Sequence, residues 1–190
     1  MTAGEFFAWV HLPENGDRCF ELERGEVVEM PLPGKYHGFV CGNVSFLLSI
    51  FARQRAKGYV CTNDAGIIVE HDPDTVRGAD VSFYEDSQTA DNMERKYSAE
   101  PPVLAVEVMS PSDRINRTVR RVTQMLNMGV KQVWVVDPQA RDVSIYRTGR
   151  DPEILTVEQE LIASDILPGF RCLIGDFFNV PALNPGNGTA

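Results

Sequence analysis

The segment 103–109 constrains the fold more than any other part of the sequence. Six of its seven residues are apolar and only Glu107 is charged. Such a run is typical of a strand that is central in its sheet and covered on both faces. The chain must therefore supply packed layers on both sides of this strand, and 10 Phe, 5 Tyr and 2 Trp exclude disorder as its main state.

The flanking segments predict an α/β fold. Val40, Val44, Leu48 and Phe51 share one face of a helix over 35–57, and Gly58 follows it. A second helix is expected over 114–128, before Gly129. Further elements are expected as follows: a helix over 3–10, a hairpin within 19–30, strands over 59–62, 66–70, 79–84, 132–136 and 142–146, and a short helix over 174–178. This order predicts a mixed β-sheet flanked by helices, a sandwich rather than a doubly wound fold.

The length and composition indicate one domain. The chain has 190 residues, of which 43% are hydrophobic and 24% charged, enough for one buried core. We expect a single domain over 1–180 and a flexible C-terminal tail over 181–190, where Pro, Gly and Asn accumulate.

Charge and targeting signals narrow the class of protein. The net charge of −9 provides no general electrostatic footprint for nucleic acid, although a local basic patch is compatible with it. The first residues lack a basic region before an apolar run, and no stretch has the roughly 20 apolar residues of a membrane span. The four cysteines show no metal-binding or redox spacing. We therefore expect a cytoplasmic protein.

Two carboxylates are the candidates for chemistry, since no phosphate-binding, dinucleotide-binding, zinc-protease or serine-hydrolase motif is present. Glu107 interrupts an apolar strand, and Asp80 lies near the start of another. A buried carboxylate without a partner is costly, so both side chains need a partner or a cleft. If the strands are neighbours, the two carboxylates can hold a divalent cation. An ion pair with an arginine remains the structural alternative.

The helix over 114–128 adds cationic candidates. Helical spacing places Arg114 and Arg121 on one flank of an apolar stripe, facing a cleft beside the sheet, whereas Arg117 points further outward. The stripe consists of Ile115, Val119, Val122 and Leu126. A solvated basic face is equally compatible with this pattern. His37, early in the helix over 35–57, and Glu26, after Gly25, are further candidates with ordinary structural alternatives.

Several segments together resemble one family. They are Gly25-Glu26, His37-Gly38, Thr75-Val-Arg-Gly-Ala-Asp80-Val, Val106-Glu-Val-Met-Ser-Pro-Ser-Asp113, Gly129-Val-Lys-Gln-Val-Trp-Val-Val-Asp-Pro138 and Leu167-Pro-Gly-Phe170. Their order and spacing are similar to the Uma-two family of restriction-endonuclease-like proteins, in the PD-(D/E)XK nuclease superfamily.

The resemblance implies a metal-dependent nuclease. Asp80 and Glu107 would bind Mg²⁺ or Mn²⁺, and the backbone carbonyl of Val108 would complete the ligand set. The superfamily lysine two residues after the acid is Met109 here, and the position from which related members draw a lysine is Arg121. Arginine stabilises phosphate charge but does not act as a base.

The resemblance also suggests roles for the remaining candidates. Glu26 and His37 stand in the shared motifs and complete the candidate catalytic set. Arg114, Arg117 and Arg121 are the candidate substrate-binding residues. Family habit and strand edges further suggest a homodimer.

Two functions follow from these residues. The first is hydrolysis of DNA phosphodiester bonds, which the retained Asp80 and Glu107 favour. The second is a catalytically degenerate nuclease-fold module that binds nucleic acid or a protein partner, which Arg121 and the acidic net charge favour.

Overall fold

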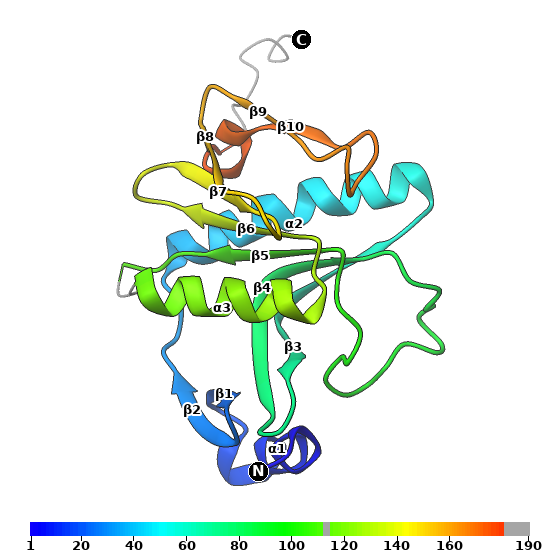
Figure 1. The fold of residues 1–190 in the computed structure, drawn as a ribbon, viewed down its shortest axis with the longest axis vertical. Helices are drawn as coiled ribbons and strands as arrows, with labels where there is room; N and C mark the ends of the chain where they lie inside the picture. Colours follow the sequence, from blue (N-terminus) through cyan, green and yellow to red (C-terminus); the bar gives the residue numbers. More distant parts are fainter. Residues whose placement is uncertain (112–114, 181–190) are drawn as a thin grey trace, which may run out of the picture.

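The computed structural model describes residues 1–111 and 115–180; Arg114 and the expected tail over 181–190 lie outside them. Figure 1 shows the arrangement of the elements. In chain order they are α1 (Ala3–Val10), η1 (Pro13–Asn15), β1 (Cys19–Glu23), β2 (Glu26–Met30), α2 (Lys35–Arg55), β3 (Tyr59–Glu70), β4 (Thr75–Tyr84), β5 (Leu104–Val108), α3 (Ile115–Met128), β6 (Gln132–Asp137), β7 (Asp142–Tyr146), β8 (Glu153–Thr156), β9 (Glu160–Ile162), β10 (Arg171–Leu173) and η2 (Ile174–Phe177). None of the helices in the described ranges combines the length and apolar character needed to cross a bilayer.

One mixed sheet organises the molecule. Its strands follow the order β2-β1-β4-β5-β6-β7-β8, and β3 pairs with β4 off this path. β5 and β6 pair in parallel, and α3 connects these two strands. As expected from the sequence, β5 is central, and all five of its residues are buried.

The sheet is covered on both faces. Alternate residues of β5 and β6, such as Val106 and Trp134, pack with α2 and with the C-terminal segment that contains β9, β10 and η2. The intervening residues, such as Ala105 and Val133, pack with α3. Because successive strand residues point to opposite faces, α2 and α3 cover opposite sides of the sheet (Figure 1).

The structure corrects four details of the sequence-based expectations. The strands expected over 59–62 and 66–70 form a single strand, β3, whose register shifts between Thr62 and Ala65. The helix expected over 35–57 ends at Arg55, and the short C-terminal helix is a 3-10 helix over Ile174–Phe177. In α3, the expected inward stripe is wrong at its first half, since Ile115 is 74% exposed.

The buried side of α3 is therefore unusual. Its buried residues include Arg121 and Gln124 beside Val122 and Met125. The hydrophobic pattern failed here because some of the residues facing this helix, such as Glu21 and Glu107, are charged, so that Arg121 has partners in the interior.

Candidate active site

A cleft of about 870 Å³ opens where β4 leaves one neighbouring strand and joins another. β4 pairs with β1 at Val76 and with β5 only from Val81 onward. Between these pairings Gly78 has no partner in β1 or β5, although it pairs with Gly66 of β3 on the other side of β4. Its N–H donates to Glu21 Oε1 at 3.0 Å, and its carbonyl accepts from Arg121 Nη2 at 2.8 Å. Charged side chains thus satisfy backbone groups that a continuous ladder would have paired.

Asp80 stands at this junction and lines the cleft. Its Oδ2 accepts a hydrogen bond from the backbone N–H of Val108 at 2.6 Å, and its Oδ1 lies 3.3 Å from His37 Nε2. β4 and β5 are therefore joined here through a carboxylate, and 15% of the Asp80 side chain is exposed.

Glu107 lies next to Asp80 across the junction. Val81 pairs with Val106 in antiparallel register, so the next positions along the two strands, Asp80 and Glu107, are neighbours. Glu107 is buried and also lines the cleft. Burial raises the pKa of Glu107 to about 7; Arg121 opposes this rise, and the charge of Asp80 adds to it.

Arg121 occupies the space beside Glu107. Its Nε and Nη2 donate to the two carboxylate oxygens of Glu107 at 2.8 and 3.1 Å, and its Nη1 donates to Glu21 Oε1 at 2.6 Å. Burial alone would lower the pKa of Arg121, but the two carboxylates outweigh it and raise that pKa above its usual value. The guanidinium therefore stays charged.

Glu21 is a member of the site that the sequence reasoning missed. It sits between Phe20 and Leu22 in β1, where alternation indicates an outward-facing residue, yet it is buried. Burial favours a raised pKa, but Arg121, Arg77 and the N–H of Gly78 lower the pKa of Glu21 overall. The arginine pairing that was the structural alternative for Asp80 and Glu107 is present for Glu107, through Arg121, whereas the partner of Asp80 is His37.

The ion pairs continue below α3. Arg77 Nη1 donates to Glu21 Oε2 and its Nε to Gln124 Oε1, both at 3.0 Å. Gln124 Nε2 donates in turn to Glu70 Oε2 at 2.9 Å. We call Glu21, Arg77, Glu107 and Arg121 the buried charge network.

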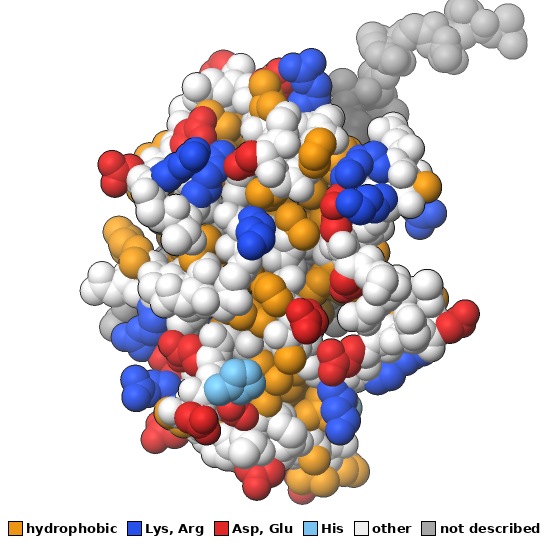
Figure 2. Space-filling model, turned by 45° about the vertical axis from the view of Figure 1, so that its right-hand side comes forward, with side chains coloured by type: hydrophobic (Ala, Val, Ile, Leu, Met, Phe, Trp, Pro, Cys, Tyr) orange, Lys and Arg blue, Asp and Glu red, His pale blue; other side chains and the backbone are white. Residues whose placement is uncertain are grey.

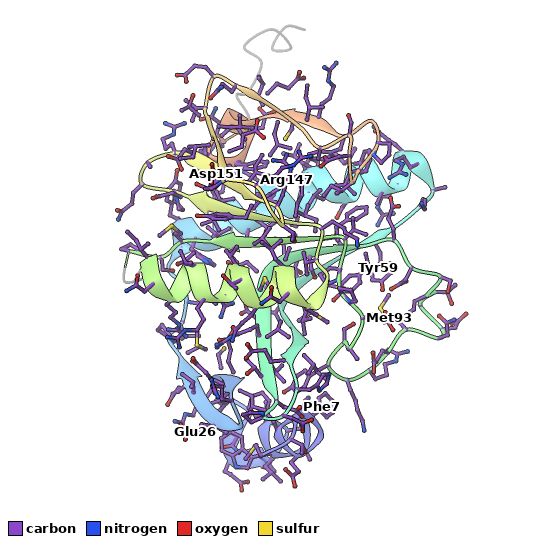
Figure 3. All side chains as sticks on the ribbon, viewed as in Figure 1. Phe7, Glu26, Tyr59, Met93, Arg147 and Asp151 are labelled. Carbon is purple, nitrogen blue, oxygen red and sulfur yellow. The ribbon has the colours of Figure 1, made fainter. Side chains whose placement is uncertain are left out.

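The other expected residues divide into those at the cleft and those away from it. His37, Val108 and Arg117 line the cleft; the Arg117 guanidinium is 3.9 Å from Glu21. Glu26 is not brought into the site, because it is exposed at the start of β2, and Figure 3 shows it on the hairpin near α1.

Asp64 is a further cleft residue absent from the expectations. It lies where the register of β3 shifts between Thr62 and Ala65, it has a positive φ of 54°, and it lines the cleft. Burial, Asp80 and Glu21 raise the pKa of Asp64. Adding a Cβ to Gly78 would place it 2.6 Å from the Asp64 side chain, so only glycine permits this approach of β3 to the junction.

The donor set at the junction fits a hard divalent ion. A carboxylate has about four lone-pair sites. Arg121 uses two on Glu107, while Val108 and His37 engage two on Asp80. Both carboxylates therefore keep acceptor capacity toward the cleft, and oxygen ligands of this kind suit Mg²⁺ and Mn²⁺.

Comparisons with known proteins agree with this picture. A family model, Uma2, with the description "Putative restriction endonuclease", matches residues 3–176. A solved structure from Anabaena variabilis, titled a "putative nuclease belonging to DUF820", has a TM-score of 0.78 and 16% sequence identity, and covers 94% of this chain and 97% of its own. At this identity the likeness shows the fold, and the expected restriction-endonuclease-like core is confirmed. No curated protein matches the sequence.

Proposed function

The chain belongs to the Uma2 family, and from that membership we propose that it is a nuclease that hydrolyses DNA phosphodiester bonds with Mg²⁺ or Mn²⁺. The observation that carries the proposal is the convergence of Asp80 and Glu107 on one cleft, at the point where β4 and β5 separate. Two carboxylates facing the same solvent-accessible space are what a hard-ion site requires.

Asp80, Glu107 and the backbone carbonyl of Val108 would hold the ion. When bound, a divalent ion supplies charge for the phosphate and a more acidic water molecule. His37 orients Asp80 from the side of α2 through its Nε2, and Val108 orients it through the backbone N–H. The carboxylate is thus fixed before substrate arrives, which favours catalysis.

Arg121 supplies the positive charge beside the carboxylates. Its four hydrogen bonds to Glu107, Glu21 and Gly78 engage four of the five N–H donors of a guanidinium. It therefore acts at phosphate mainly as a fixed charge. Arg117, at the mouth of the cleft with 40% of its side chain exposed, and Arg114 are the proposed phosphate contacts.

Figure 2 shows acidic and basic side chains interspersed on the face in view. With a net charge of −9 the protein as a whole attracts DNA weakly, so we expect the proposed arginine contacts to supply the binding.

The second candidate function is binding without cleavage. The observation that favours it is that Arg121 is held in ion pairs with Glu107 and Glu21. An arginine in these contacts does not replace the lysine of related members as a proton donor or base. Such a module would keep the cleft and the arginines and bind nucleic acid or a protein partner.

Nicking of supercoiled plasmid DNA in the presence of Mn²⁺ tests the proposal. We expect the wild type to nick, and Asp80→Asn and Glu107→Gln to lose on the order of 10²-fold or more. Glu26→Gln is the matched control, because it removes a carboxylate exposed on the hairpin and should leave the rate unchanged. A wild type that binds DNA but does not nick it supports the second candidate.

Two broader features belong to the same proposal. All four cysteines are free thiols, which fits a reducing compartment such as the cytoplasm.

Phe46 and Ile50, one turn apart on α2, are 63% and 37% exposed, and a homodimer would cover such apolar surface. Sedimentation of the wild type and Phe46→Glu should show a dimer and a monomer; a monomeric wild type rejects the dimer.

A further inference from the structure

A second group of possible metal ligands lies at the N-terminal end of α2. His37 and Cys41 are four residues apart and so lie on the same helix face. Cys41 Sγ is 3.5 Å from His37 Nδ1, and His37 Nε2 is 3.3 Å from Asp80 Oδ1. Counting one ligand atom from each residue, the three atoms lie within 4.8 Å of one another.

We propose that His37, Cys41 and Asp80 form a binding site for a thiophilic divalent ion such as Zn²⁺. Thiolate, imidazole and carboxylate are its usual protein ligands, and three of them leave a fourth position open. With the usual zinc–ligand bond lengths, tetrahedral ligand atoms lie about 3.4–3.6 Å apart. The sulfur–nitrogen distance already has this value, and one ligand atom from each of the three residues lies within 4.8 Å of the other two.

The position of the three residues gives the open coordination site access to solvent. His37 and Asp80 line the large cleft, while Cys41 is half-buried and packs against the core between α2 and the sheet. An ion held by these ligands would face the cleft with its fourth position.

The chemistry of the two sites differs although they share Asp80. Asp80 with Glu107 offers oxygen only, which suits Mg²⁺ and Mn²⁺. His37 and Cys41 add nitrogen and sulfur, and a thiolate selects zinc over magnesium. The sequence reasoning missed the second group because Cys41 shows no paired-cysteine spacing and its partner Asp80 is 39 residues away.

Protons are the competitor for this site. Burial raises the pKa of the Cys41 thiol, and hydrogen bonds with Asp80 and Cys41 raise the pKa of His37 to about 10. Asp64 of β3 adds negative charge near both groups. Because the ion binds a thiolate and a neutral imidazole, its binding would release protons to solvent, and a mildly alkaline buffer is the appropriate condition.

Titration of the full chain with Co²⁺, a spectroscopic substitute for Zn²⁺, tests the site without DNA. We expect one equivalent to bind with thiolate-to-cobalt charge-transfer absorption, and Zn²⁺ to displace it. Cys41→Ser should abolish that absorption, whereas Cys61→Ser, which alters another half-buried thiol, should retain it. Absorption that is missing from the wild type, or that persists in Cys41→Ser, overturns the proposal.

A variant that misfolds would also lose the absorption, so a second variant is needed. His37→Gln keeps the thiol and a similar side-chain size, and with native circular dichroism it should bind Co²⁺ at least 10-fold more weakly. Unchanged affinity in this folded variant contradicts the assignment of His37.

One consequence rests on the proposed nuclease function. Because Asp80 is shared, Zn²⁺ should inhibit Mn²⁺-dependent nicking. With each protein's rate expressed relative to its own rate without Zn²⁺, the inhibitory Zn²⁺ concentration should be at least 10-fold higher for Cys41→Ser than for the wild type. Inhibition that is equal in the two proteins contradicts the coupling. Absence of any nicking rejects the nuclease function, while the Co²⁺ titration still decides the ion site.

Discussion

The two faces of the central sheet bury opposite kinds of side chain. The face toward α2 is covered by an apolar cluster that extends from Val40 to Phe178 and includes Trp134 and Phe177. The face toward α3 has a smaller apolar cluster and, next to it, the buried charge network. The same strands, β4, β5 and β6, therefore separate an apolar core from an interior in which apolar and charged side chains lie next to each other.

We attribute stability mainly to the apolar face and function to the face with the buried charge network. Apolar burial stabilises a fold in proportion to its area, whereas buried ion pairs pay a desolvation cost that their attraction only partly returns. A face that served stability alone would be better filled with apolar residues. The charge network beside the cleft is therefore best explained by the chemistry that we propose for Asp80 and Glu107.

The largest effect is expected for Arg121→Ala. It leaves Glu107 and Glu21 buried without their shared partner, and breaking a buried pair in this way costs about 3–5 kcal/mol. Urea unfolding should show this loss in the free energy of unfolding. Arg121→Lys keeps the charge and should recover part of the stability and retain or raise nicking. A loss below about 1 kcal/mol for Arg121→Ala would show that the network is solvated.

Leu48→Ala tests the opposite face. Leu48 is fully buried in the cluster under α2, and such a truncation costs about 2–5 kcal/mol. The expected difference from Arg121→Ala lies in function: nicking per folded molecule should stay at the wild-type level. A specific loss of nicking in folded Leu48→Ala would mean that the two faces are not separable.

Glu107→Gln separates the contribution of ion binding to stability from the contribution of the fold itself. At a Mn²⁺ concentration of 100 times the Kd, binding adds about 2.7 kcal/mol to the stability of the wild type. Glu107→Gln should lose this gain while its circular dichroism stays native, and EDTA should remove the gain from the wild type. An undiminished thermal shift in the variant would place the ion elsewhere.

The smallest effect is expected for Arg120→Ala. Arg120 Nη1 is 2.7 Å from Glu23 Oε1, but 63% of its side chain is exposed. Exposed ion pairs contribute about 0–1 kcal/mol, so stability and nicking should both remain close to wild type. A loss comparable to that of Arg121→Ala would show that the charge network extends to the surface.

Most of the fold could be predicted from the sequence because its elements carry strong local patterns. The run around Glu107 and the one-sided helix with Val40, Val44 and Leu48 appear as expected. The interruption at Asn63 and Asp64 was misleading: both residues have positive φ, yet pairing resumes at Ala65. Long-range pairing with β4 maintained a strand that local signals divided.

The site was less predictable because partners came from distant segments. Asp80 and Glu107 could be chosen as candidates because apolar strands tolerate few carboxylates. Glu21 was missed since it alternates with Phe20 and Leu22 as an exposed residue would, and its partners Arg77 and Arg121 come from distant segments. The orientation of α3 depended on these hidden charges, so the first half of its expected apolar stripe, Ile115 and Val119, is exposed.

Anomalous diffraction from a crystal soaked in Mn²⁺ tests the central claim most directly. We expect one peak in the cleft, at about 2.0–2.6 Å from carboxylate oxygens of both Asp80 and Glu107, with Arg121 still bound to Glu21. A peak that touches neither carboxylate, or no peak at a Mn²⁺ concentration that supports nicking, would contradict the assignment of the charged face as the functional one.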